Sequence, residues 1–182
     1  MRISTLYLGI YIALLALTSC STPTSECAHT PSPELLHKLA QTSTWHMQGR
    51  FSAVHNNQAF SGGYAWQQHA DHFSITVTGP LGVPVAYIQG KDTSATITGA
   101  NQTQPQALNA FLHHELGFDG DITLLRSILM GTNKPYIDAS ALQIQQQYNC
   151  ITVLPVPEKV VLHWHNHDRL TIKTQRWEAT SE

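Results

Sequence analysis

Most of the chain alternates apolar and polar residues, a pattern typical of β-strands with one buried face. In the run 47–54, Met47, Gly49, Phe51 and Ala53 fall on one side and polar residues on the other. Further alternating runs occupy 59–66, 72–79, 83–89, 95–98, 142–148, 160–165 and 169–174. Turn residues separate consecutive runs, as at 56–57, 70–71 and 166–168. Many short strands joined by tight turns predict an antiparallel sheet that curls or closes on itself.

Three stretches follow the helical period instead: 33–43, 105–117 and 121–131. Pro33 suits the first turn of a helix and Asp121 suits an N-cap, while each of the last two stretches ends on a glycine. A curved antiparallel sheet has a concave apolar face. We expect these amphipathic helices to cover that face.

The first twenty residues predict an exported lipoprotein. Arg2 precedes a run without charge from Ile3 to Leu17, which is too short and wrongly flanked for a membrane span. The ending LTSC resembles the lipobox of bacterial lipoproteins, so residues 1–19 are predicted as signal peptide and Cys20 as the acylated first residue. An ordinary signal cleaved nearby, with Cys20 incidental, is the alternative. Ser21 in place of Asp favours the outer membrane by the sorting rule known for such lipoproteins.

Residues 20–33 are rich in Ser, Thr and Pro, which predicts a flexible tether, and 34–182 are long enough for a single domain with a sizeable core. Ten Lys and Arg against twelve Asp and Glu are scattered along the chain, so no nucleic-acid surface is expected. Once Cys20 is acylated, Cys27 and Cys150 are the remaining pair. Whether they form a disulfide is open, because it depends on their distance.

Rival chemistry is weakly supported. HHELGF at 113–118 has Phe118 where a zinc-protease helix needs its second histidine. His163 and His165 share one strand face and could hold a metal. They are better explained as the solvent-facing side of a strand whose apolar face carries Leu162 and Trp164. The chain has no phosphate-binding loop and no G-x-S-x-G elbow. We expect no enzyme, no cofactor and no metal.

Several short motifs follow one another along the chain: W-x-x-x-GRF at 45–51, YAWQQ at 64–68, GPLG at 79–82, LGF at 116–118 ahead of an apolar helix, and DRLTIKTQRW at 168–177. In this order they resemble the outer-membrane lipoprotein receptor family LolB. Together with the lipobox they cover nearly the whole chain. The resemblance implies a mainly β (α+β) fold, an unclosed antiparallel β-barrel or strongly curved sheet, with a helical lid over an apolar cavity.

The resemblance also implies a function. Family members accept lipoproteins from the periplasmic carrier LolA and insert them into the outer membrane. The expected partners are LolA, acylated lipoprotein cargo and outer-membrane lipid, for a monomer anchored in the outer membrane of a Gram-negative bacterium and facing the periplasm. One alternative is a tethered lipoprotein of the same fold that binds or senses another acyl ligand. Another is an assembly scaffold, whose interior would be filled with side chains rather than empty.

Aromatic and aliphatic side chains of the strand and helix runs are candidates to line the cavity. Core filling is the competing explanation for each of them. The candidates are Phe51, Tyr64, Trp66, Phe73, Ile75, Leu112, Leu125 and Trp177. Arg50 of the GRF motif falls on the polar face, as a surface cation would. Trp66 and Trp177 lie on the matching motifs, which favours the cavity for these two.

The turn GPLGVP carries apolar side chains where turns of soluble proteins usually face water. Pro80, Leu81, Gly82 and Val83 form its centre. Burying a leucine in lipid is worth about 1.5–3 kcal/mol, enough to orient a tethered domain. In the LolB family the matching leucine projects from this loop. We therefore expect a membrane-insertion loop with Leu81 at its point.

One segment departs from the family. Between Tyr148 and Val160 the chain has only NCITVLPVPEK, where family members usually fit additional strand sequence. Pro155 and Pro157 exclude a regular central strand there. We expect one wall of the barrel to be shorter or more open.

Overall fold

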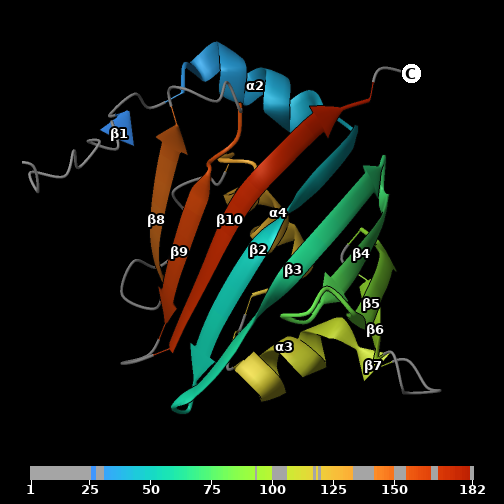
Figure 1. Ribbon diagram of the computed structural model, residues 1–182. Coiled ribbons are helices and arrows are strands. Elements are labelled where there is room, and N and C mark those ends of the chain that lie inside the picture. The colour runs from blue at the N-terminus through green and yellow to red at the C-terminus, as the bar shows by residue number, and fades with distance from the viewer. Residues whose placement is uncertain are drawn as a thin grey trace, which may run out of the picture.

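A curved antiparallel sheet forms most of the molecule (Figure 1). The computed structural model describes residues 26–27, 31–92, 94–99, 106–116, 118, 120–132, 142–149, 155–164 and 168–180. Within these residues the sheet has ten strands in the order β1-β8-β9-β10-β2-β3-β4-β5-β6-β7. The strands are β1 (Glu26–Cys27), β2 (Thr44–His55), β3 (Gln58–His69), β4 (His72–Thr78), β5 (Pro84–Lys91), β6 (Ser94–Gly99), β7 (Gln106–Ala107), β8 (Leu142–Asn149), β9 (Lys159–Trp164) and β10 (Asp168–Ala179).

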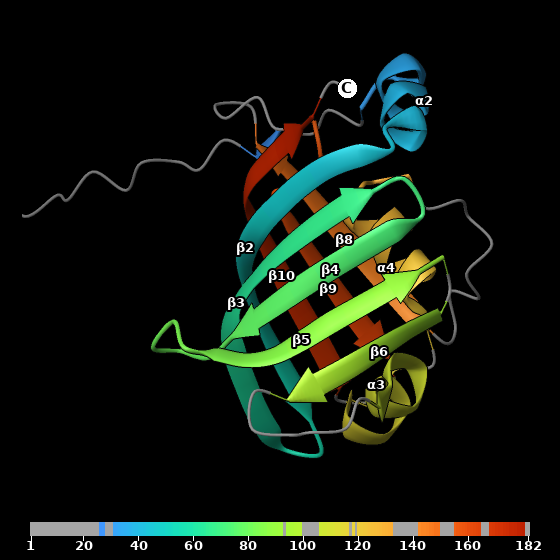
Figure 2. The same cartoon turned by 90° about the vertical axis from the view of Figure 1, so that its right-hand side faces the viewer.

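The sheet curls without closing. Its outermost strands, β1 and β7, lie at opposite ends of the strand order and do not pair with each other in the described part of the chain. The helices are α2 (Pro33–Gln41), α3 (Leu108–Leu116) and α4 (Ile122–Leu129). Figures 1 and 2 show α3 and α4 on the concave side of the sheet and α2 at one end. The predicted architecture, an unclosed antiparallel sheet with helices over its concave face, is confirmed.

Tight turns hold the long central strands in register. β2 and β3 pair from Thr44 opposite His69 to His55 opposite Gln58. The intervening Asn56 and Asn57 have φ angles of 49° and 62°, which matches the twist of a two-residue hairpin and is tolerated by asparagine. The turn predicted at these residues is therefore confirmed.

β10 is longer than the predicted run 169–174, because a bulge interrupts its alternation. The register against β2 shifts between Thr174 and Arg176, so that Thr174 lies opposite Gly49 and Trp177 opposite Met47. The bulge turns both residues toward the concave side although they are three positions apart. The alternation of apolar and polar residues breaks at the bulge, whereas the backbone pairing with β2 continues to Ala179.

Capping defines the helices. Ser32 accepts a hydrogen bond from the Leu35 amide at 3.2 Å, and Asp121 accepts one from the Leu124 amide at 2.7 Å. The prediction for 105–117 was wrong at its start, since Gln106 and Ala107 pair with β6 as β7 before α3 begins at Leu108. Pairing of Gln106 and Ala107 gives hydrogen-bond partners to backbone groups at the edge of β6. These groups would lack those partners if the helix began at residue 105.

Two segments outside the predicted strands lie beside β8. β1 lies inside the predicted tether, where Glu26 pairs with Asn149 and Cys27 with Tyr148 of β8. After β8, residues 155–158 bend with Val156 and Pro157 buried, and β9 begins at Lys159. β8 and β9 then pair directly. The chain thus returns to the sheet immediately after Pro155 and Pro157, which themselves lie outside any strand.

Candidate functional site

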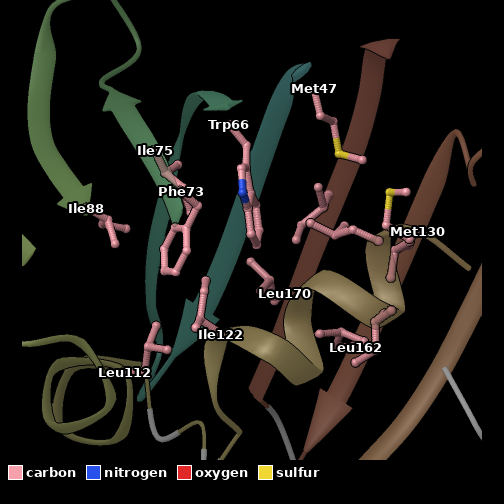
Figure 3. Close-up of a cluster of buried hydrophobic side chains, with 14 of the residues drawn as sticks. Met47, Trp66, Phe73, Ile75, Ile88, Leu112, Ile122, Met130, Leu162 and Leu170 are labelled. Carbon is pink, nitrogen blue, oxygen red and sulfur yellow. The ribbon is translucent and has the colours of Figure 1, made fainter. Parts of the chain in front are cut away.

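The concave face of the sheet carries the predicted cavity residues. Trp66, Phe73, Ile75 and Leu112 are buried in the hydrophobic core, while Phe51, Tyr64, Leu125 and Trp177 are partly buried and pack against it. The Trp66 ring lies 5.4 Å from that of Trp45 and 5.8 Å from that of Phe73, between ring centroids. Figure 3 shows Trp66 and Phe73 pointing from the strands toward Ile122 of α4 and Leu112 of α3. The sequence therefore identified the apolar face correctly.

Among the described residues, these side chains share one hydrophobic core with those of the helices. A hollow of about 290 Å³ lies instead beside α2, α4 and the start of β2. Its lining is partly polar and includes Leu39, Trp45, Gln68, Arg126, Ser127 and Met130. None of the eight predicted cavity residues lines this hollow, whereas Phe73 is in the lining of a second, more open one of about 530 Å³. In this closed arrangement the helical side chains occupy the concave face where the cavity was expected.

Contacts between α4, the residues before it and the far strands help to hold the helical cover in place. The ring of Phe118 packs edge-on against Trp164 of β9 with centroids 5.3 Å apart. On β8, the Gln146 side chain donates a hydrogen bond at 2.7 Å to the carbonyl of Ile128, in the last turn of α4. The sequence analysis named Phe118 in the LGF motif and as the residue that excludes a zinc-protease helix, but its packing against Trp164 carries no local signal.

A buried polar network supports the centre of the face. The Trp66 indole donates to Gln68 Oε1 at 3.2 Å, and Gln68 Nε2 donates to the carbonyls of Ala70 at 2.7 Å and His72 at 3.2 Å. Gln68 is only 3% exposed. The side chain thereby joins the β3–β4 turn to the tryptophan. Polarity alone would have placed Gln68 on the surface, so the sequence did not reveal this role.

Two further polar groups on the concave side lack partners among the described residues. They are the hydroxyl of Tyr64 and the indole nitrogen of Trp177. Burial raises the pKa of Tyr64 to about 12, and the nearby Thr174 hydroxyl offsets this only in part. Buried donors without acceptors cost free energy, so this part of the face favours an acceptor that the closed fold does not supply.

The loop between β4 and β5 projects from the opposite side of the molecule (Figure 2). Its backbone is closed by hydrogen bonds from the Gly79 amide to the Val83 carbonyl at 2.9 Å and from the Gly82 amide to the Gly79 carbonyl at 3.0 Å. Gly82 has a φ of 78°, a conformation that favours glycine. Leu81 is 92% exposed and Val83 is 62% exposed. Leu81 and Val83 thus project into solvent from a loop that its own backbone hydrogen bonds close.

The exposed apolar surface extends beyond the loop. Val85 and Tyr87 of β5 are exposed, while Ala86 and Ile88 between and after them face the core. Val85 and Tyr87 were not predicted as part of the apolar loop surface. Their alternation with Ala86 and Ile88 was the available signal, because it assigns the two to the outer face.

The other predicted sites are only partly described. Cys20 and Cys150 lie outside the described residues, and of Cys27 only the backbone pairing is described, so the open question of a Cys27–Cys150 disulfide is not tested. His163 is on the outer face of β9, opposite buried Leu162 and Trp164, and His165 falls outside the described part. Among the described residues no three His, Cys, Asp or Glu side chains come together as metal ligands. No described helix has both the length and the apolar character to cross a bilayer.

The family model for the outer membrane lipoprotein LolB matches residues 43–177. The chain belongs to the LolB family. Residues 43–177 span the sheet from the start of β2 to near the end of β10, including the projecting loop and both helices on the concave face. LolB proteins are outer-membrane lipoproteins that take part in lipoprotein localisation. The resemblance inferred from the motifs is confirmed.

Individual LolB proteins match at modest identity. The protein of Francisella tularensis subsp. novicida is 26% identical over 105 residues, which are 54% of this chain and 50% of that one. Those of Cellvibrio japonicus and Halorhodospira halophila are 23% identical over 141 residues and 24% identical over 138 residues; the matches cover 75% and 74% of this chain and 70% and 68% of theirs. The chain thus spans about half the length of the Francisella relatives. A crystal structure of a LolA superfamily protein from Nitrosomonas europaea aligns with a TM-score of 0.48 at 8% identity, over 85% of this chain and 96% of that one.

Proposed function

We propose that this chain is an outer-membrane receptor that accepts lipoproteins from the periplasmic carrier LolA and inserts their acyl chains into the membrane. Acyl chains on Cys20 would hold it at the outer membrane. Membership of the LolB family, the lipobox and the apolar concave face support the proposal. The observation that carries the insertion step is Leu81, which is 92% exposed at the tip of a loop facing away from the helices.

Transfer between cavities follows from the cost of exposing acyl chains. Each CH₂ group of a lipid chain is worth about 0.8 kcal/mol of burial, so a triacylated protein released into water would lose roughly tens of kcal/mol. The cargo must therefore pass from one apolar surface to the next without an aqueous intermediate. The concave face, with the side chains of Trp66, Phe73 and Ile75 in its centre, is the apolar surface available here.

Cargo binding requires the helices to move. The hollow of about 290 Å³ beside α2 is partly polar and near the lower end of the ~300–1,000 Å³ typical of sites for drug-sized ligands, too small for three acyl chains. Displacing α3 and α4 would expose the concave face, and the contacts to be broken include Phe118–Trp164 and Gln146–Ile128. An acyl chain would then replace the helical side chains in contact with the sheet.

The loop suits the release step. A single leucine contributes about 1.5–3 kcal/mol when buried in lipid, which orients a tethered domain against the bilayer but does not anchor it. The loop is rigid enough to present that leucine, since its own backbone hydrogen bonds close it at Gly79, Gly82 and Val83. Leu81 would enter the membrane at the moment of release.

A transfer assay tests both steps. The unacylated chain, made as Cys20→Ala, is mixed with LolA preloaded with a radiolabelled lipoprotein, and the acylated chain is then used to deliver the label to liposomes. We expect Leu81→Glu to accept cargo normally and to insert it poorly. Gln89→Glu, which adds the same charge at an exposed position of β5, is the matched control.

Each outcome has a distinct meaning. Failure of the parent chain to take label from LolA would refute the receptor proposal. Equal insertion by Leu81→Glu and the parent would refute the role of the loop. Binding of label without any release to liposomes would favour the alternative, a tethered lipoprotein that binds or senses acyl chains.

A further inference from the structure

Three cations stand in one row across three adjacent strands. In the strand register, Arg50 of β2 lies directly opposite Lys173 of β10, and Lys173 lies directly opposite Lys159 of β9. Their strand neighbours Gly49, Ile172 and Val160 face the core, so the three cations face away from it. This set, Arg50, Lys173 and Lys159, is called the basic row below. The basic row therefore lies on the convex face of the sheet. Figure 1 shows α3 and α4 on the other face.

The basic row has no internal counter-charge. None of its members forms an ion pair within the described residues, in contrast to Arg176, whose Nε lies 3.7 Å from Glu178 Oε1. The nearest positions on the same face, Gln48, Ser52 and Thr171, are uncharged. Like charges directly opposite each other destabilise a sheet. The fold therefore leaves these three cations available to an external anion.

The basic row is continuous with the apolar loop. Arg50 pairs with Gly63 of β3, Gly63 with Thr78 of β4, and Thr78 with Pro84 of β5. The cross-strand line that contains the cations thus ends at Thr78 and Pro84, the two residues between which the loop carrying Leu81 emerges. Only small or uncharged residues separate the two features. Figure 2 shows the loop projecting on the convex side of β2 and β3.

We propose that the basic row docks on anionic phospholipid headgroups of the membrane that receives Leu81. A bilayer offers apolar chains and surface anions in one plane, so it satisfies the exposed leucine and the unpaired cations together. An acidic protein would satisfy the cations alone and leave Leu81, Val83, Val85 and Tyr87 in water. The docking explains how a domain on a long tether presents a fixed face to the bilayer. It goes beyond the proposed cargo transfer and rests on it only for the role of Leu81.

Vesicle binding tests the proposal directly. The whole mature chain, residues 20–182 with Cys20→Ala to prevent acylation, is co-sedimented with vesicles of phosphatidylcholine and with vesicles that also contain phosphatidylglycerol. We expect Arg50→Gln/Lys173→Gln to lower the partition coefficient onto the anionic vesicles by roughly tenfold or more. Each of the two cations adds its own attraction to the anionic surface, and the variant loses both. Partition onto phosphatidylcholine alone should not change. Added salt should reduce the binding of the parent to the level of the variant.

Two controls isolate the row. Lys38→Gln/Lys91→Gln makes the same change in net charge on α2 and at the far end of β5, and it should keep most of the anionic binding. Urea unfolding of Arg50→Gln/Lys173→Gln should show a midpoint equal to or above that of the parent, because a like-charge pair is removed. Lost binding then cannot be assigned to a damaged fold.

Three results would overturn the proposal. An equal loss in Lys38→Gln/Lys91→Gln would mean that net charge, not the row, attracts the vesicles. Unchanged binding of Arg50→Gln/Lys173→Gln would mean that the row does not touch the lipid. Unchanged vesicle binding together with lost uptake from LolA would assign the row to the carrier instead.

Failed cargo transfer by the parent with intact anionic binding would remove the receptor proposal and leave the docking standing.

Discussion

The ring of Tyr64 on β3 covers Gly49 on the neighbouring strand β2. The two residues are directly opposite in the register, and the tyrosine hydroxyl lies 2.9 Å from the position that a Cβ at residue 49 would take. The carbonyl of Lys173 on β10 crowds the same position from the other side. The centre of the sheet therefore depends on a close approach of three strands that only glycine permits.

Gly49→Ala should destabilise the domain. The added methyl group would overlap the Lys173 carbonyl, a backbone atom that cannot move without shifting β10, and would displace the Tyr64 ring. We expect a loss of about 1–3 kcal/mol in the free energy of unfolding, typical of overpacking. Urea denaturation followed by tryptophan fluorescence measures it. Ser52→Ala, on the exposed face of the same strand, should change the midpoint little; an unchanged Gly49→Ala midpoint would show that the strands can separate at no cost.

The stability of the domain should fall at high pH through Tyr64. Its pKa is raised from 10.0 to about 12 by burial, so below pH 10 its hydroxyl is protonated in the folded and the unfolded chain alike. Between pH 10 and 12 the unfolded chain loses this proton first, and the free energy of unfolding declines by about 2–3 kcal/mol across that window. Tyr64→Phe removes an unpartnered hydroxyl, so it should unfold like the parent at pH 8 and decline less steeply above pH 10. Parallel curves for the two proteins would contradict the assignment.

Gln68 should matter far more than its neighbour. Gln68→Ala removes the acceptor of the Trp66 indole and the donor to two turn carbonyls, and it leaves a buried N–H without a partner. We expect a loss of about 2–4 kcal/mol, counting one or two unsatisfied groups. Gln67→Ala alters an exposed side chain on the same strand and should stay within about 0.5 kcal/mol of the parent. Thermal unfolding by circular dichroism compares the two, and equal shifts would contradict the network.

Weakening the helical cover should increase the binding of apolar probes. Phe118→Ala removes the edge-on contact with Trp164 and should raise the population in which α3 and α4 leave the concave face. Because apparent affinity scales with the fraction of binding-competent protein, we expect a fluorescent fatty acid to bind several-fold more tightly. Phe60→Ala, at an exposed phenylalanine of β3, is the matched control. Weaker probe binding by Phe118→Ala than by the control would contradict opening of the cover.

Much of the fold could be predicted from the sequence, because a strand with one buried face alternates apolar and polar residues within a short contiguous run. The runs around Phe51, Trp66 and Phe73 and the hairpin turn at Asn56–Asn57 are local features, and they appeared as predicted. The bulge in β10 and the switch from strand to helix at Leu108 were not, because both are set by the neighbouring strands β2 and β6. Leu81 could be named from the sequence since a leucine between a proline and glycines has few places to be buried.

By itself the sequence determined the family, the antiparallel sheet, the capped helices and the apolar loop, since each is encoded in contiguous residues. Only the tertiary structure decided that the helices fill the concave face, that Gln68 and Phe118 hold Trp66 and Trp164, and that Arg50, Lys173 and Lys159 share a row. Lys159 and Lys173 face each other across the β9–β10 hairpin, but Arg50 is far from both in the chain, on β2, which pairs with β10 out of sequence order. Register between distant strands is a property of the whole sheet, so no local pattern could have shown that Arg50 meets the two lysines.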